Sequence, residues 1–129
     1  MKEPIWIDVR DVLAIHGRLL ALEGGPSGLR DVGLLDSALA RPRHLRAYGE
    51  KVDISSLAAA YIVGIVRDHP FLDGNKRTGF LIGAVFLEMN GYRLTAAEAD
   101  ATQVIFSLAG GKLDEAALAV WIRGHIQRA

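Results

Sequence analysis

The chain has 129 residues, half of them apolar and 23% charged, and its fifteen basic and fifteen acidic residues balance to a formal net charge of zero. This composition is that of a folded domain with a full core, and it lacks the basic excess that non-specific nucleic-acid binders carry, so we expect no direct nucleic-acid partner. The absence of cysteine excludes disulfides, thiolate metal sites and cysteine nucleophiles.

Nothing in the sequence predicts a secretion signal or a membrane segment. Residues 1–13 carry acidic side chains among the apolar ones and lack a small-residue cleavage site, so they do not resemble a signal peptide. The longest apolar runs, residues 57–66 and 80–87, are well short of the roughly 20 residues that span a bilayer. We therefore expect a cytoplasmic protein with no membrane partner.

Two helices are predicted in the first third of the chain. Asp8 can cap the first helix, which the glycine pair Gly24 and Gly25 stops. Asp31 can cap a second, short helix that Pro42 ends, because proline disfavours the helical conformation in the residue before it.

Two apolar helices follow an exposed connection. Residues 41–52 (RPRHLRAYGEKV) are polar and basic without a helical period, which predicts a long connection of the kind that often carries function. Asp53 can cap a helix that reaches about Arg67, and a second helix is predicted over roughly residues 76–89, ended by Asn90. Both are apolar nearly all round, which is typical of helices at the centre of a fold.

The rest of the chain predicts two more helices. Thr95 and Glu98 have the spacing of a capping box, which would open a helix that ends at Gly110 and Gly111. Asp114 can cap a last, amphipathic helix.

Two short stretches are candidates for extended structure, Trp6–Ile7 and Tyr92–Leu94. Nothing in the sequence predicts a larger sheet. The prediction is one all-α domain over residues 1–129. It would be a compact helical bundle built around the two central apolar helices.

Residues 69–79, HPFLDGNKRTG, link these two helices and concentrate reactive side chains. A helix N-terminus offers unpaired N–H groups and a partial positive charge, which suit a phosphate, and Gly74 has no side chain to keep an anion from the backbone. Asn75 can cap the helix or hold the loop through its amide. Lys76 and Arg77 add positive charge at the rim, and a guanidinium can bind a phosphate through two hydrogen bonds.

Two further residues of this stretch suit a transfer of phosphate. Asp73 is the natural Mg²⁺ ligand, because one carboxylate together with phosphate oxygens is a common way to hold this ion. His69, with an unperturbed pKa of about 6.5, could take the proton of an attacking hydroxyl. The composite prediction is a metal-assisted transfer from a nucleotide phosphate to a hydroxyl. The residues alone leave open the alternative that they serve only as turn and cap residues.

The remaining candidates are interpreted as structural. Phe71 and Leu72 are expected to anchor the loop in the core. His16 lies within an amphipathic helix, His44 in the basic connection and His125 near the C-terminus. No spacing typical of zinc ligands links these histidines.

The stretch resembles the signature of the Fic/Doc superfamily, H-x-F-x-(D/E)-G-N-G-R-x-x-R. Lys76 replaces the second glycine of this pattern and Phe80 its final arginine, and the death-on-curing (Doc) branch makes both departures. The segments GLRDVGLLDSALARP (residues 28–42) and FLEMNGY (residues 86–92) are also similar to Doc segments in order and spacing, so the resemblance covers nearly the whole chain. The positions that match the signature are His69, Phe71, Asp73, Gly74, Asn75 and Arg77.

The resemblance implies an all-α toxin that acts as a kinase and moves the γ-phosphate of ATP onto a threonine of elongation factor Tu, which halts protein synthesis. Phe80 removes the arginine that would grip the polyphosphate for AMP transfer, and the side chain of Lys76 fills space that a glycine leaves open. A flipped nucleotide would then bring its γ-phosphate to the hydroxyl. By position, His69 would be the general base, Asp73 the Mg²⁺ ligand, and Arg67 a second catalytic residue that steadies the nucleotide or the target.

The resemblance also implies a phosphate nest and a docking flap. Gly74 and Asn75 would form the nest, while Lys76 and Arg77 would hold phosphate oxygens. The basic connection from residue 41 to residue 51 sits where the family has its flap, and an extended edge there could align a target segment by strand pairing.

Two alternatives stay open, a Fic-type adenylyltransferase and a non-catalytic protein that keeps the fold for binding. Phe80 counts against the first, and the intact set of His69, Asp73, Asn75 and Arg77 counts against the second. The inhibitory pattern (S/T)-x-x-x-E-(G/N) of many Fic enzymes does not occur in the sequence. The resemblance therefore implies restraint in trans by an antitoxin of the prevent-host-death type.

Overall fold

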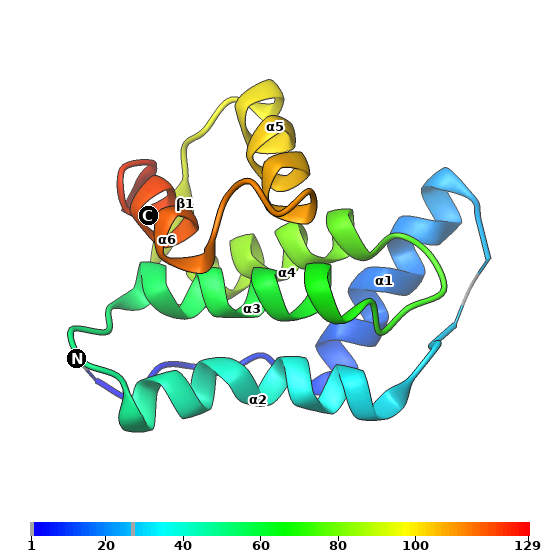
Figure 1. Cartoon of the computed structure of the whole chain (residues 1–129), viewed down its shortest axis with the longest axis horizontal. Coiled ribbons are helices and arrows are strands. Elements are labelled where there is room, and N and C mark those ends of the chain that lie inside the picture. The colour runs from blue at the N-terminus through cyan, green and yellow to red at the C-terminus, as the bar shows by residue number, and fades with distance from the viewer. Residues whose placement is uncertain (1, 27) are drawn as a thin grey trace.

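The computed structural model describes residues 2–26 and 28–129 and confirms the all-α prediction (Figure 1). Its regular structure in these residues is six helices and one pair of antiparallel strands. No helix among them is both long enough and apolar enough to cross a membrane. The elements are α1 (Val9–Glu23), α2 (Val32–Tyr48), α3 (Ile54–Asp68), α4 (Asn75–Met89), β1 (Tyr92–Leu94), α5 (Glu98–Ala109), α6 (Glu115–Arg123) and β2 (Ile126–Arg128).

Helix α3 is the centre of the bundle. All of its residues from Leu57 to Val66 are buried, and it packs against α2, α4 and α6. The loop of residues 69–74 returns the chain into α4, which lies alongside α3 (Figure 1). This loop lies at the end of the molecule where α1 also ends, so the candidate site and the C-terminal turn of α1 share one end of the bundle.

Helix α2 does not end at Pro42 as predicted, and the expected connection over residues 41–52 is helical up to Tyr48. Proline removes the hydrogen bond to the carbonyl four residues earlier, that of Ala38, which costs about 3 kcal/mol in a helix. Ala38 and Pro42 are both buried, and an added Cβ on Gly64 of α3 would lie 3.0 Å from the Ala38 Cα. Close packing of α2 on α3 therefore holds the helix together through the proline.

The extended edge expected over residues 41–51 is wrong, because this stretch is helical up to Tyr48. A helix satisfies its backbone N–H and C=O groups internally, so the helical part of this stretch offers no free edge for strand pairing. Only residues 49–53 remain outside a helix between α2 and α3.

The capping box predicted at Thr95 is also wrong. Helix α5 begins at Glu98 after Ala97, and no side chain caps it. Thr95 instead donates its N–H and its hydroxyl to the carbonyl of His125, at 2.6 and 2.8 Å. His125 immediately precedes β2, so Thr95 extends the pairing of β1 with a strand that the sequence did not predict.

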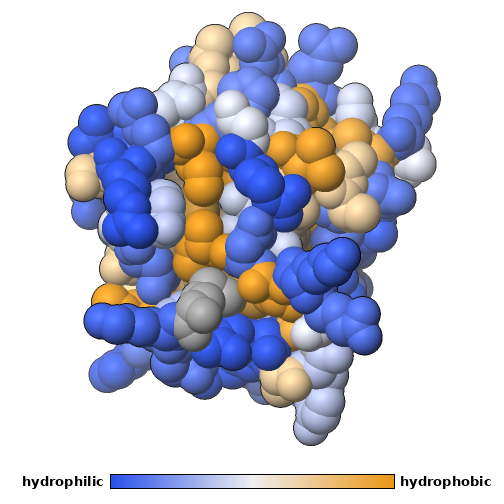
Figure 2. All heavy atoms as spheres, turned by 90° about the vertical axis from the view of Figure 1, so that its left-hand side faces the viewer, coloured by the Kyte–Doolittle hydropathy of each residue, from blue (hydrophilic) through white to orange (hydrophobic). Residues whose placement is uncertain are grey.

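The segment before α1 forms no strand but packs on the core. The N–H of Ile7 donates to the Tyr61 hydroxyl at 3.2 Å, and Trp6 stacks on Phe86 with ring centroids 6.1 Å apart. Burial raises the pKa of that Tyr61 hydroxyl. The end of the molecule that carries both termini is largely hydrophilic, with narrow apolar strips between polar side chains (Figure 2). The α3–α4 loop lies at the opposite end (Figure 1).

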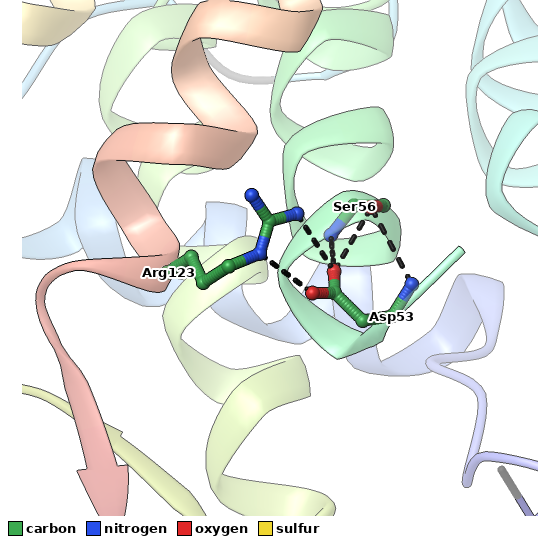
Figure 3. Close-up of polar contacts among 3 residues, drawn as sticks. All are labelled: Asp53, Ser56 and Arg123. Carbon is green, nitrogen blue, oxygen red and sulfur yellow. Dashed lines mark hydrogen bonds and ion pairs between the residues drawn. The ribbon is translucent and has the colours of Figure 1, made fainter. Parts of the chain in front are cut away.

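One ion pair joins α6 to the start of α3 (Figure 3). Arg123 donates from Nε and Nη2 to the Asp53 carboxylate at 2.6 and 3.1 Å, and the N–H of Ser56 donates to the same carboxylate at 2.9 Å. The hydrogen bonds from Arg123 lower the pKa of Asp53 from 3.8 to about 2. Because the folded-state pKa is depressed, this stabilisation is present above the unfolded pKa and is lost as the pH falls towards the folded one.

Replacement of Asp53 by asparagine should therefore destabilise the protein in a pH-dependent way. We expect Asp53→Asn to lower the free energy of unfolding by up to about 1 kcal/mol near pH 7, the magnitude typical of exposed ion pairs, since asparagine still caps the helix. The deficit should shrink as the pH falls from about 4 towards 2. Urea denaturation at several pH values measures it, with Asp31→Asn as the control.

Asp31 caps α2 but pairs with no cation among the described residues, so Asp31→Asn replaces a capping carboxylate without breaking an ion pair. A deficit for Asp53→Asn that stays constant down to the lowest pH would contradict the assignment.

Candidate active site

The reactive stretch forms the turn between the two most extensively packed helices. His69 is the C-cap of α3 and adopts a left-handed conformation with φ 52°, which leaves its imidazole exposed. Gly74 is the N-cap of α4, also left-handed at φ 77°. The four residues between them therefore reverse the chain direction within a single short loop.

Asn75 holds this loop through its side chain. Its Oδ1 accepts the N–H of Phe71 and its Nδ2 donates to the Phe71 carbonyl, both at 3.0 Å, and the Asn75 side chain is buried. The same Nδ2 lies 3.4 Å from Nδ1 of His69. Of the two roles predicted for Asn75, capping and holding the loop, the structure supports the second.

The predicted core anchors behave differently from one another. Phe71 is 1% exposed and packs in the core, which confirms its prediction, whereas Leu72 is 53% exposed and lines the cavity described below. The backbone is extended at this point: Phe71 forms an isolated antiparallel β-bridge with Leu29, and Leu72 donates its N–H to the carbonyl of Gly28. Successive side chains of an extended segment point to opposite sides, so Phe71 faces the core and Leu72 faces the cavity. The prediction for Leu72 is therefore wrong.

Two side chains from outside the stretch also contact the backbone of this loop. The Arg30 guanidinium donates to the carbonyls of Asp68 and His69 at 2.9 and 2.8 Å and so satisfies the C-terminal end of α3. His16 of α1 is buried, with its Nε2 2.9 Å from the carbonyl of Asp73. Neither contact has a local sequence signal, because the partners lie 38 or more residues apart.

A cavity of about 820 Å³ opens beside the loop. Its near wall is formed by the loop and the first turn of α4, and its far walls by apolar side chains of α4 and α5, among them Phe80, Ile105 and Phe106. Arg67 is not part of the lining, and its guanidinium donates instead to the carbonyl of Leu113 at 3.4 Å. The predicted residues that line the cavity are His69, Asp73, Gly74, Asn75, Lys76 and Arg77.

The two cations at the rim both have partners within the chain. Arg77 forms an ion pair with Glu23 in the last turn of α1, and the Lys76 ammonium lies over the ring of Phe106, 5.8 Å from its centroid. Both side chains are exposed, so neither contact is buried enough to hold the cation against a stronger anionic ligand.

The N-terminus of α4 is open to a ligand. Helices α1, α2, α3 and α6 are each capped by an aspartate side chain, whereas α4 has no side-chain cap. Its first intrahelical bond runs from the N–H of Thr78 to the carbonyl of Gly74, and among the described residues the N–H groups of residues 74–77 have no acceptor. Such groups, together with the helix dipole, are able to bind an anion.

Asp73 stands next to this helix end. Its carboxylate is exposed to the cavity and makes no hydrogen bond or ion pair with the described residues. These residues contain no cluster of three or more metal-ligating side chains. The donor set therefore fits a magnesium ion shared between one carboxylate, water and the phosphates of a ligand, rather than a cage formed by the protein alone.

A sequence model of the Fic/DOC family matches residues 6–87, which include the whole loop and most of α4. The chain is 43% identical over 95 residues to the protein named toxin Doc of Mycolicibacterium smegmatis, covering 70% of this chain and 68% of that protein. It is 32% identical over 88 residues to the protein named protein kinase doc of Escherichia phage P1, covering 68% of this chain and 70% of the relative. The chain belongs to the Fic/DOC family, as its sequence signature indicated.

The two hydrogen bonds between the Asn75 side chain and the backbone of Phe71 are expected to stabilise the folded protein. Asn75→Leu should lower the free energy of unfolding by about 1–3 kcal/mol, because it leaves two buried backbone groups of Phe71 without partners. Urea denaturation measures the change. Thr78→Val provides a matched control in the same helix, since the Thr78 hydroxyl is buried with no hydrogen-bond partner among the described residues.

Removal of that hydroxyl should leave stability unchanged or raise it. Equal destabilisation by Asn75→Leu and Thr78→Val would mean that the Asn75 contacts do not hold the loop.

Proposed function

We propose that this protein is a Doc-type toxin that transfers the γ-phosphate of ATP to a hydroxyl of a target protein. The observation that carries the proposal is the open N-terminus of α4, which lies in one cavity with a histidine and an unpaired carboxylate. The names of the two relatives, a toxin and a protein kinase, agree with it.

The phosphates would bind at the start of α4. The unpaired N–H groups of residues 74–77 point out of the helix end and can donate to phosphate oxygens. Lys76 and Arg77 flank them, and a polyphosphate carries enough charge to replace the exposed partners of these cations, Phe106 and Glu23. Asp73 would hold the magnesium ion that neutralises charge on the phosphates during transfer.

His69 is the only imidazole in the lining of this cavity among the described residues. The Asn75 amide can donate only to an unprotonated Nδ1, so in this arrangement the neutral ring carries its proton on Nε2. The ring can then accept a proton at Nδ1, or at Nε2 once its own proton has moved to Nδ1, and by either route the long Asn75 contact is given up. Because His69 is exposed, a ring nitrogen that is not in contact with Asn75 is open to a substrate.

The proposed reaction is a direct transfer from ATP to the target, without a covalent enzyme intermediate. The target oxygen attacks the γ-phosphorus, the bond from that phosphorus to the bridging oxygen breaks, and ADP leaves. The hydroxyl proton passes to the imidazole of His69. Transfer of the γ-phosphate, rather than of AMP, is favoured because Phe80 lines the cavity where the signature of AMP-transferring relatives has an arginine.

The proposed target is a threonine of elongation factor Tu, and the proposed consequence is arrest of protein synthesis in the cytoplasm. The proposed partner is an antitoxin of the prevent-host-death type. Two points support restraint by a partner: one relative is named as a toxin, and the chain lacks the inhibitory pattern by which many Fic enzymes restrain themselves.

The transferred group distinguishes this proposal from its main alternative. With elongation factor Tu and ATP labelled on both the α- and γ-phosphates, we expect the γ label alone to reach the target. His69→Ala should reduce the transfer by about 10²–10⁴-fold. Mass spectrometry of the target provides the independent readout, and an added AMP instead of a phosphate would move the protein to the adenylyltransferases.

Expression in cells tests the partner. The wild-type chain expressed alone should arrest growth, and co-expression of the adjacent small protein of its operon should restore it. His69→Ala at equal expression should be harmless, which separates toxicity of the activity from toxicity of the protein load. Growth without arrest despite folded wild-type protein and a susceptible target would refute the toxin role.

A further inference from the structure

We propose that helix α1 and the residues just beyond it position Asp73, the proposed magnesium ligand, through two contacts: a hydrogen bond from His16 and a close approach of the backbone at Gly25. Both residues lie outside the reactive stretch. The inference rests on the proposed function in assigning the metal to Asp73, but the contacts themselves are properties of the fold.

The first contact fixes the backbone at Asp73. His16 is 3% exposed, and its Nε2 lies 2.9 Å from the Asp73 carbonyl. A carbonyl only accepts, so Nε2 carries the proton and donates. The ring is in turn held by stacking on Phe71, with centroids 3.8 Å apart and planes 11° apart. The imidazole of His16 is therefore held from two sides, by helix α1, which carries it, and by the buried ring of Phe71.

This hydrogen bond also orients a donor of the phosphate site. The peptide group that joins Asp73 to Gly74 is planar and trans, so its C=O and N–H point in opposite directions. His16 holds the carbonyl towards the protein interior. The N–H of Gly74, the first of the unpaired donors at the start of α4, consequently points away from His16.

The second contact leaves room for the carboxylate. An added Cβ on Gly25 would be 2.6 Å from Oδ2 of Asp73, closer than such atoms approach in proteins. Gly25 also has φ 109°, a conformation that favours glycine. The carboxylate thus packs against bare backbone just beyond the end of α1. Because Gly25 has no Cβ, the carboxylate can occupy this place, and a side chain at residue 25 would displace it.

The role of His16 can be separated from simple packing by paired substitutions. His16→Gln keeps an N–H donor at nearly the same reach, whereas His16→Met fills the space without one. Val12→Ala, one turn earlier on the buried face of α1, weakens the packing of the helix without touching the loop. The measurement is the affinity for ADP by calorimetry, with magnesium and with a chelator, for each variant.

We expect His16→Met to lose about 10–100-fold of the magnesium-dependent gain in affinity, as for other residues that orient metal ligands, and His16→Gln and Val12→Ala to stay within about threefold of wild type. The Gly74 amide resonance in the ligand-free protein should shift in His16→Met and return towards its wild-type position in His16→Gln. Wild-type affinity in His16→Met, or a loss in His16→Gln as large as in His16→Met, would overturn the proposal.

A second pair of variants tests Gly25. Gly25→Ala should weaken magnesium-dependent binding, because its methyl group displaces the Asp73 carboxylate. Gly111→Ala also places a side chain at a positive φ of 77°, but it meets no atom within 4 Å and lies outside the cavity lining, so it should bind like wild type. Equal magnesium-dependent affinity for ADP in the two variants would show that Gly25 does not position Asp73.

An error in the proposed function can be distinguished from an error in the role of His16. If wild-type protein shows no magnesium-dependent affinity for ADP, the assignment of Asp73 to the metal is wrong. The Gly74 resonance would still report whether His16 orients the loop.

Discussion

The burial of one aromatic ring sets the geometry of the whole site. Phe71 is almost completely buried, it stacks on His16, and both of its backbone polar groups are bonded to the side chain of Asn75. These contacts draw the middle of a short polar loop into the core. His69 and Asp73, two residues to either side, are then left exposed in the same cavity. The reactive groups are therefore positioned by an apolar anchor, not by contacts with each other.

Helix α4 completes the site because its two apolar faces have different uses. One face packs on α3, where an added Cβ on Gly83 would lie 2.6 Å from Ile62. The other face presents Phe80, Leu81 and Ala84 to the cavity. The sequence predicted a helix that is buried all round, since hydrophobic periodicity cannot distinguish the wall of a ligand cavity from the core. The uncapped start of the same helix lies at the edge of this apolar cavity, where the phosphates are proposed to bind.

Local signals predicted most of the elements and the reactive stretch, while contacts distant in sequence decided the rest. The aspartate caps of α1, α3 and α6 act within one turn, so their starts could be predicted. Pro42 is tolerated because of packing on α3, and Thr95 is bonded near β2, neither of which a local pattern contains. The contact from His16 to Asp73 spans 57 residues, so the sequence predicted only a structural histidine there.

The proposed function requires that the open N-terminus of α4 is a preformed phosphate site. The most direct measurement is a titration of ¹⁵N-labelled protein with ADP and magnesium, followed by amide chemical shifts. The largest changes should occur at residues 74–77, whose N–H groups gain acceptors, with smaller changes along the apolar walls of the cavity. Saturable binding that leaves the amides of residues 74–77 unchanged would contradict it.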